Sequence, residues 1–493
     1  MKNINYLFLI ICIVLLGSVK LFAQDDDEDF EDFSVVSSAL QNGEPEGVAA
    51  NFLYSHIADQ NYIGMRLRPE LSFGKFGIGL DIPVMINMAD WKVDTKEYTD
   101  GIGVIRIFRY ISWGVKKKDN VYVKVGELSD AFLGFGCLLN NYNNSISYEK
   151  RKLGIEFDMT FKKIYGLEML YSDIDVHSFN LLALRPYYKP FGATSIPIIK
   201  TLEVGIGGVF DHDNTSIGAD SVMYKTNNFV NDGVSGFSAD AGLYLLRLKW
   251  LQFKVYTQYG HLNKITNTNL DTYINSGLFA IAYPTVDLSH VQNYKGGNGI
   301  SIGTEFKFKL LGNRIRLNWK AERIWYSDYY LPQFFDFGYE LNKDAKVLSL
   351  IQAKAKGGTY ADLTFSVLDK IILNGSLLIP DKVGIEAPAM LKIGMDLSNI
   401  YDKLILYGTY YKGNLTSLQD AFKIDNNSMM NVRAAWKIYE IDLIKLLFIG
   451  GVDYKWSFAT SKDGMFDAAS YISPYFSISL PLGVNKESVP EEE

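Results

Sequence analysis

The chain has 493 residues, of which 48% are hydrophobic and 14% aromatic, with 42 Gly, only 13 Pro and a formal net charge of −7. Beyond residue 20 no uninterrupted apolar run approaches the roughly 18 to 20 residues of a membrane helix, and the charge does not favour nucleic-acid binding. Aromatic-rich strands separated by many turns indicate an all-β protein with membrane interfaces, with a large soluble β-sandwich or propeller as the alternative.

The start of the chain predicts export. Lys2 gives a short positive beginning, residues 6–17 are apolar, and Ala23 offers a small residue for cleavage before Gln24. We therefore expect residues 1–23 to be a cleaved signal peptide. Cys12 lies within it, which leaves Cys137 as the single cysteine of the mature chain, expected to be an apolar filler without a disulfide.

Two acidic segments flank the region that is expected to fold. Residues 25–32 (DDDEDFED) hold seven acids in eight positions, and the end of the chain reads ESVPEEE. We expect an acidic periplasmic leader over 24–47 and an acidic C-terminal tail over 484–493, because such dense charge does not pack. The leader is either simply solvated or a handle for a basic periplasmic partner or a divalent ion.

From about residue 50 the apolar pattern has a period of two. Within 63–73, apolar residues or Pro occupy the odd positions, and Arg66, Arg68 and Glu70 occupy even ones, so that the two sets face opposite sides of a strand. The same alternation recurs at 76–86, 153–161, 237–245, 300–309, 315–321, 359–368, 371–380, 389–398, 403–412, 430–438, 445–457 and 470–482.

Connections of two lengths separate these strands. Short turns fall near Gly74, Lys163, Leu248, Gly312, Asp369 and Tyr401, and long segments lie at 89–103, 128–151, 211–235, 261–298, 326–357, 412–430 and 457–469. Short and long connections alternate, which predicts a single transmembrane antiparallel β-barrel over 48–483, of about 16–20 strands, with short periplasmic turns and long extracellular loops. An even strand number needs a strand before 62–73, and 49–57 is the candidate.

The texture of the chain resembles a known group. Its alternating strands are rich in Lys, Asn, Tyr and Phe, and the stretches RLRPELSFGKFGIGLDI (66–82) and VYVKVGELSDAFLGFGCLLNNY (121–142) carry the likeness most clearly. They resemble uncharacterised, porin-like outer-membrane barrels of the Bacteroidota. The resemblance implies the fold and an outer-membrane location, and it implies no substrate. One departure is the polar tail, since many such barrels end on an aromatic residue.

A two-residue turn at Leu311–Gly312 is predicted to place Lys309 opposite Arg314 and Lys307 opposite Arg316. Like charges directly opposed destabilise a sheet, so we expect them in a wet lumen that water or anions screen. The expected lumen lining is Arg66, Arg68, Glu70, Glu305, Lys307, Lys309, Arg314, Arg316 and Lys320. A basic stripe of this kind favours anionic solutes; the alternative is an ordinary polar lumen, with charges offset by Glu70, Glu305 and Glu322.

The segment 326–357 is unusually aromatic for an exposed loop. Its candidate residues for binding a ligand or plugging the barrel are Tyr329, Tyr330, Phe334, Phe335 and Tyr339. The alternative is an aromatic girdle at the outer interface that continues into a loop folded into the lumen.

No catalytic motif is found: the five His form no H-E-x-x-H pair, and no G-x-S-x-G is present. The group of metal-capable residues at 211–214 is interpreted as a loop start, so we predict no enzyme, no cofactor and no metal. The segment before the first strand is too short for the plug domain of a gated receptor. The expected function is passive transport of small polar or anionic solutes through the bacterial outer membrane, whose lipid is the other partner. The alternative is a non-conducting structural or ligand-binding barrel serving an envelope secretion or assembly complex.

Overall fold

The structure is a computed structural model. It describes residues 47–57, 60–93, 105–144, 152–174, 179–212, 233–282, 284, 286–311, 314–340, 343–368, 370–397, 403–425, 427–441, 446–460 and 466–480. The predicted signal peptide, the acidic tail and all of the leader except Gly47 lie outside these residues.

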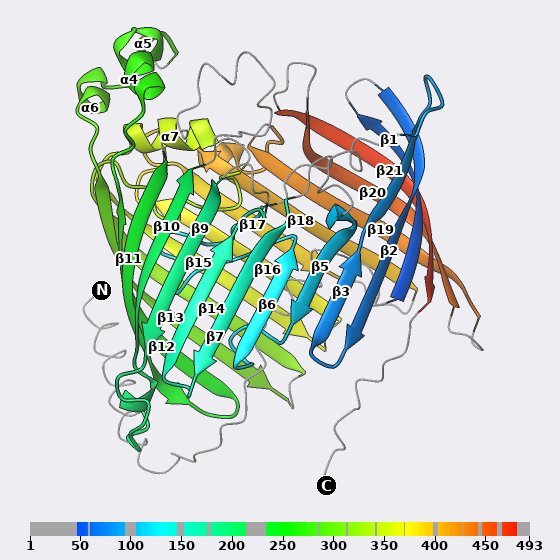
Figure 1. Cartoon of the computed structure of the whole chain (residues 1–493), viewed down its shortest axis with the longest axis horizontal. Helices are drawn as coiled ribbons and strands as arrows, with labels where there is room; N and C mark the ends of the chain where they lie inside the picture. Colours follow the sequence, from blue (N-terminus) through cyan, green and yellow to red (C-terminus); the bar gives the residue numbers. More distant parts are fainter. Residues whose placement is uncertain are drawn as a thin grey trace.

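One antiparallel sheet of 21 strands makes up most of the molecule (Figure 1). The strands are β1 Gly47–Ile57, β2 Gln60–Phe73, β3 Phe76–Leu80, β4 Ile82–Asn87, β5 Phe108–Trp113, β6 Val121–Gly126, β7 Gly154–Phe161, β8 Tyr165–Tyr171, β9 Phe179–Tyr188, β10 Glu203–His212, β11 Val234–Arg247, β12 Leu251–Leu262, β13 Gly297–Leu310, β14 Ile315–Tyr326, β15 Lys356–Val367, β16 Ile371–Pro380, β17 Ala389–Asp396, β18 Leu404–Leu415, β19 Ser428–Ile441, β20 Leu446–Thr460 and β21 Phe466–Leu480.

Neighbouring strands pair in chain order around the sheet. β3 and β4 both pair with β2 and are separated by Asp81 alone. They therefore count as one interrupted strand, and the sheet is then twenty strands wide. β1 pairs with β2 and also with β21, where Val48 lies opposite Leu480, so the ladder returns to its first strand. The predicted antiparallel barrel of 16–20 strands is confirmed, and so is the strand expected at 49–57.

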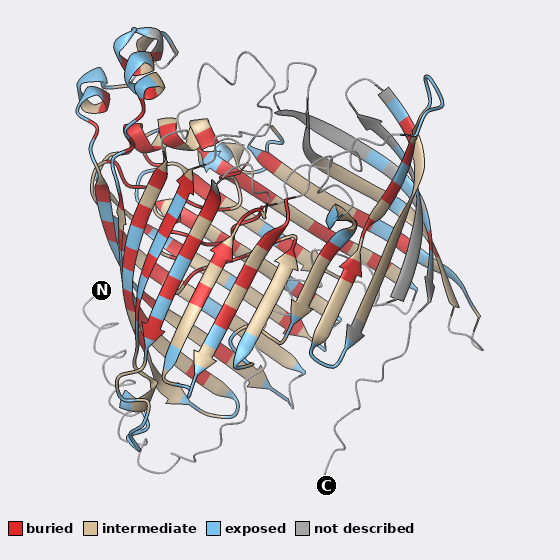
Figure 2. Ribbon diagram, viewed as in Figure 1, coloured by how far each residue is buried: buried red, intermediate tan, exposed pale blue. Residues whose placement is uncertain are grey.

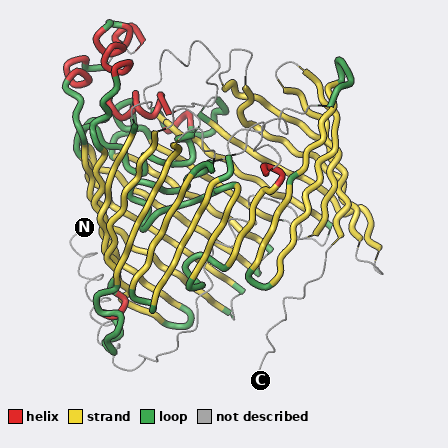
Figure 3. Tube along the Cα trace, viewed as in Figure 1, coloured by secondary structure: helices red, strands yellow, loops and turns green. Residues whose placement is uncertain are grey.

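The two ends of the barrel differ in their connections (Figure 3). One end has short turns, apart from the connection 189–202 with its 3-10 turn η3 (Ile199–Thr201). The other has the long segments, as expected, and they carry the 3-10 turns η2 (Ile105–Ile107) and η4 (Leu418–Asp420) and the helices α4 (Thr268–Asn275), α5 (Leu278–Ala282), α6 (Leu288–Gln292) and α7 (Lys343–Gln352). These helices were not predicted. No helix in the described part of the chain is long and apolar enough to cross a membrane.

Side chains alternate between the two faces of the wall. Along β10 every second residue is exposed, with Ile206 at 68% and Phe210 at 42%. Val209 and Asp211, the two neighbours of Phe210 in the chain, are buried. Figure 2 shows this banding as alternating red and pale blue along the strands β9–β11. The exposed face of the wall is thus mainly apolar, and the buried face carries charged residues such as Asp211, the arrangement expected where hydrocarbon surrounds the wall and polar groups lie inside.

Candidate functional site

The interior contains a plug made from two connections at the long-loop end. We define the plug as residues 128–144, after β6, and 329–340, after β14. The two segments lie alongside each other: Leu139 and Phe335 form a parallel bridge, the Phe335 N–H donates to the Leu138 carbonyl at 3.0 Å, and the Gln333 N–H donates to the Cys137 carbonyl at 3.0 Å. Segments that are about 190 residues apart in sequence therefore meet inside the barrel.

The aromatic residues predicted for the long loop belong to this plug. Tyr329, Tyr330, Phe334, Phe335 and Tyr339 are between 0 and 4% exposed, and all are members of the main hydrophobic cluster. Buried this deeply, they do not form an exposed surface for a ligand, and they fit a loop folded into the lumen. Phe335 and Tyr339 pack edge to face at 4.9 Å, a favourable aromatic geometry.

Glycines on the inner face of the wall make room for the plug. A Cβ on Gly299 of β13 would lie 2.5 Å from the Tyr330 ring, and one on Gly260 of β12 would lie 2.4 Å from its hydroxyl. A Cβ on Gly242 of β11 would lie 2.6 Å from the Phe135 ring. Contacts this short do not occur in folded proteins, so a larger residue at these positions would displace the plug.

Ion pairs fix the plug to the wall. The Lys152 ammonium donates to Glu340 at 2.7 Å, and the Tyr142 hydroxyl donates to the same carboxylate at 2.5 Å. Asp211 accepts from Tyr339 and from Lys343, both at 2.7 Å. Asp211 is the first of the metal-capable residues at 211–214 noted in the sequence, and its carboxylate is engaged in an ion pair with Lys343. Within the described ranges no cluster of three or more His, Cys, Asp or Glu could hold a metal.

A buried arginine organises the wall beside the plug. Arg185 of β9 is 1% exposed and contacts three carboxylates: Glu168 at 2.9 Å, Glu203 at 2.9 Å, and Asp240, which it contacts through two nitrogens. Its guanidinium also lies 5.7 Å from the centre of the Phe135 ring of the plug. This network offsets charge within the interior, and sequence patterns gave no sign of it.

The predicted register of the β13–β14 hairpin is wrong. Leu310 pairs with Ile315, so the turn holds four residues, and its backbone is closed by Arg314 N–H donating to the Leu311 carbonyl. Lys309 therefore lies opposite Arg316, and Lys307 lies opposite Asn318. One like-charge pair, Lys309 with Arg316, therefore replaces the two that were expected. Arg314 is exposed in the turn and does not line the lumen.

Acidic neighbours offset several of the remaining charges predicted for the lumen. Lys307 lies 3.3 Å from Glu305, and Lys320 lies 3.0 Å from Glu322 while also donating to the Phe135 carbonyl of the plug. Glu70 accepts from Arg109 at 2.6 Å. Around Glu70, Lys307 and Lys320 the interior therefore has the mixed polar lining that was the alternative to a basic stripe.

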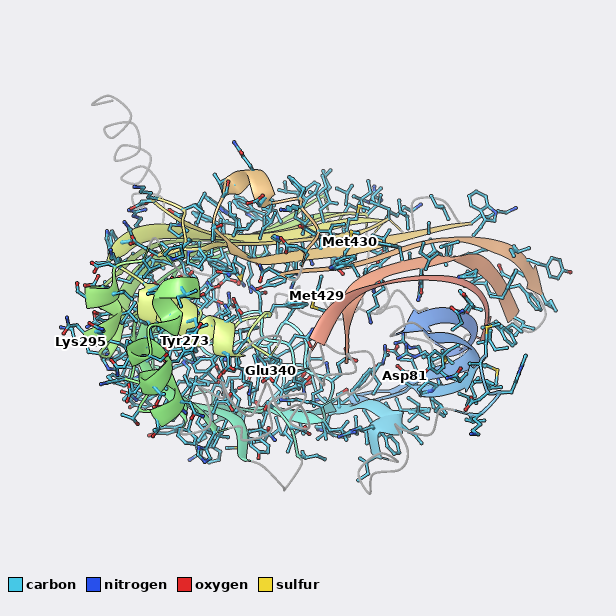
Figure 4. The ribbon with its side chains drawn as sticks, turned by 90° about the horizontal axis from the view of Figure 1, so that it is seen from above. Asp81, Tyr273, Lys295, Glu340, Met429 and Met430 are labelled. Atoms are coloured by element: carbon cyan, nitrogen blue, oxygen red, sulfur yellow. The ribbon has the colours of Figure 1, made fainter. Side chains whose placement is uncertain are left out.

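A second charged group lies on the wall formed by β1–β5 and β19–β21. Asp81 is 1% exposed and accepts from Arg66 at 2.5 and 2.6 Å and from Arg68 at 3.0 and 3.2 Å. Lys455 of β20 lies within electrostatic range of both arginines, of Asp81 and of Glu127. We call Arg66, Arg68, Asp81, Lys455 and Glu127 the cationic group. Seen from above, Asp81 and the plug residue Glu340 lie in different halves of the interior (Figure 4).

A pocket of about 130 Å³ opens between α7 and the wall strands β15–β18. Its walls are mostly apolar, and Tyr326, Leu378 and Tyr411 are among the lining residues. One side carries an ion pair in which Lys346 donates to Asp336 at 2.6 Å. The plug residues Leu331, Asp336 and Gly338 also line this pocket, so it adjoins the plug.

Comparison with known proteins gives fold-level likeness only. No family model matches the chain, and no curated protein matches its sequence. Among solved structures, it is similar to Wzi, a carbohydrate-binding β-barrel involved in capsule assembly in Escherichia coli, with 11% identity over 91% of this chain and 87% of that chain and a TM-score of 0.33. It is also similar to the outer-membrane protein OpdK of Pseudomonas aeruginosa, with 9% identity over 88% and 97% and a TM-score of 0.30, and to OprD of the same organism, with 7% identity over 88% and 92% and a TM-score of 0.28. At these TM-scores the backbones superpose poorly, so the comparison assigns no role to any residue of this chain.

Proposed function

We propose that this protein spans the bacterial outer membrane and conducts small polar solutes passively, with a preference for anions, through the part of the lumen beside the plug. The proposal includes no catalytic step and no cofactor. It is supported by an outer face of exposed apolar side chains and an inner face of charged ones. Its partners are the surrounding lipid and the passing solutes.

The cationic group is the observation that carries this proposal. It brings three cationic side chains together with two carboxylates, and its arginines keep 13 and 19% of their side-chain surface exposed. Wet charges of one predominant sign raise the local concentration of the opposite ion and lower the barrier to its passage. Asp81, which both arginines contact, lies in a different half of the interior from Glu340 (Figure 4), so an anion would meet the group beside the plug.

Reversing one charge of this group is expected to shift ion selectivity. In a tenfold KCl gradient across a planar bilayer, the unaltered protein is expected to favour chloride, and Lys455→Glu is expected to lower the chloride-to-potassium permeability ratio at least threefold. Lys455 suits this test because the contacts of Arg66 and Arg68 with buried Asp81 stay in place.

The matched control is Lys264→Glu, which makes the same charge change at an exposed residue of the long-loop end. It is expected to leave the reversal potential nearly unchanged. Retained migration as a folded barrel on an unheated gel checks that both variants fold. A cation preference in the unaltered protein, or a reversal potential that Lys455→Glu does not move, would contradict the proposal.

Removing part of the plug is expected to widen the path. Deleting residues 330–338 takes out Tyr330, which fills the space against β12 and β13, together with the buried Phe334 and Phe335. We expect single-channel conductance to rise severalfold, because conductance scales with the open cross-section. An unchanged conductance in a folded deletion variant would mean that the plug does not border the conducting path.

A further inference from the structure

The short-turn end of the barrel is strongly basic. Counted by sequence, its turns hold thirteen Lys or Arg and four Asp, whereas the long connections at the opposite end hold more acids than bases. Among the described residues of these turns the one carboxylate is Asp119. Charge is therefore divided between the two ends of the molecule, although the barrel as a whole is nearly neutral.

Three neighbouring turns near β1 concentrate this charge, and we call them the basic rim: 74–75, 114–120 and 162–164. Lys118, Lys162 and Lys163 are exposed. Lys75, 59% exposed, lies 2.5 Å from Asp119, the acid of these turns. Lys116 and Lys117 contact Glu156 and Glu168 of the wall, so they add little to the outward-facing charge. By formal charge, the other four lysines of the rim outnumber Asp119 by three.

The backbone holds the rim lysines at the tip of their hairpin. Lys162 and Lys163 have φ of +52° and +55°, as the central residues of a type I′ turn do, and the Ile164 N–H donates to the Phe161 carbonyl at 3.1 Å. Asn, Asp or Gly is the usual choice at such positions. Two consecutive lysines in left-handed conformation indicate that charge is retained there despite a local conformational cost.

The chain supplies an oppositely charged segment at the same end. β1 begins at Gly47, which pairs with Glu70, and the three residues 71–73 separate Glu70 from the turn at 74–75. The leader therefore joins the barrel roughly 10 Å from the level of the rim. The fourteen residues 33–46 connect Gly47 to the seven acids of 25–32. Such a linker spans roughly 20 Å as a flexible chain and about 48 Å when extended.

The rim lies within that reach. Neighbouring strands are about 4.8 Å apart, so the turn at 162–164 lies roughly 30 Å from β1 along the wall. From these positions and opposite charges we propose that the acidic leader, 25–32, docks on the basic rim of its own chain. The occupant is thus a segment of this protein, and the competing occupant is the anionic lipid of the facing leaflet.

The test uses the mature chain, residues 24–493, with a photoreactive benzoyl-phenylalanine in place of Phe30, in nanodiscs of neutral phosphatidylcholine at 50 mM NaCl. We expect cross-links, mapped by mass spectrometry, to concentrate in peptides that contain 114–120 and 162–164. Yield is expected to fall at least fivefold in 1 M NaCl, where the screening length is about 3 Å. It should fall equally in a variant whose acids at 25–32 are replaced by Asn or Gln.

A matched pair of rim variants tests the position. Lys118→Glu/Lys162→Glu/Lys163→Glu is expected to abolish these cross-links, whereas Lys264→Glu at the opposite end is expected to leave them unchanged. Cross-links spread evenly over the molecule, or yields that neither salt nor charge removal changes, would overturn the proposal. Cross-links that disappear when the nanodiscs contain 30% phosphatidylglycerol would also overturn it, and would assign the rim to anionic lipid.

Discussion

Replacing Gly299 by Val is expected to accelerate maleimide labelling of Cys137 by at least tenfold. The wall glycine faces Tyr330, whose hydroxyl lies 3.5 Å from the Cys137 sulfur, and a Cβ at this position would lie 2.5 Å from the Tyr330 ring. The added side chain forces Tyr330 away, and the thiol loses its cover. Rates of labelling are measured on the folded protein in detergent at pH 8.

The unaltered protein sets a low baseline for this experiment. Loss of hydration within the plug raises the pKa of the half-buried Cys137 thiol to about 12. Because the thiolate is the reactive form, a shift from the usual pKa of about 8.5 reduces the reactive fraction at pH 8 by about 10³-fold. Labelling of the unaltered protein should therefore speed up with pH well beyond pH 9.

Gly208→Val is the control for this prediction. Gly208 lies in β10, and no atom lies within 4 Å of a Cβ built on it, so the variant adds the same bulk without touching the plug. Its labelling rate should match that of the unaltered protein. Rapid labelling of Cys137 in the unaltered protein, or equal rates in the two glycine variants, would show that the plug does not cover this thiol in solution.

Replacing Arg185 by Ala is expected to lower the free energy of unfolding by about 3–5 kcal/mol, because it leaves Glu168, Glu203 and Asp240 close together without their shared cation. Urea-induced unfolding in lipid vesicles measures the loss. Adding Asp240→Asn to Arg185→Ala is expected to recover part of it, since one of the stranded charges is removed.

An exposed ion pair provides the comparison for Arg185. Arg323 contacts Asp381 at 2.5 and 2.6 Å, with side chains 40 and 50% exposed. Arg323→Ala is expected to lower the free energy of unfolding far less than Arg185→Ala does, because water screens an exposed pair. A loss from Arg185→Ala no larger than this would mean that water reaches the Arg185 network and replaces the guanidinium.

The strands of the barrel wall could be predicted from the sequence because each of them follows the same physical rule. Apolar and charged residues alternate around Arg66 and Arg68, and the barrel follows from that alternation and from the regular change of connection length. The hairpin at 311–314 shows where the rule stops. Turns of two and four residues leave every side chain on the same face, so alternation cannot distinguish the two registers.

The interior was only partly predictable. The aromatic loop 326–357 drew attention by composition, but its partner, 128–144, is separated from it by eight strands and shares no local pattern with it. The contact of Arg185 with Asp240 joins β9 to β11, two strands away. The alternation within each strand carries no information about contacts between strands that are not neighbours. Inward-facing glycines such as Gly260 and Gly299 were the available signal, because small residues on the polar face mark space occupied by something else.

The pairing of Leu139 with Phe335 has a consequence for biogenesis. The first segment leaves the ribosome long before the second, and the seam between β1 and β21 becomes complete only when the final residues arrive. Both segments are connections at the long-loop end, so they reach the interior from that end, and forming the wall does not by itself bring them together. The rate at which the filled barrel forms should therefore depend on how quickly two distant stretches of the chain find each other.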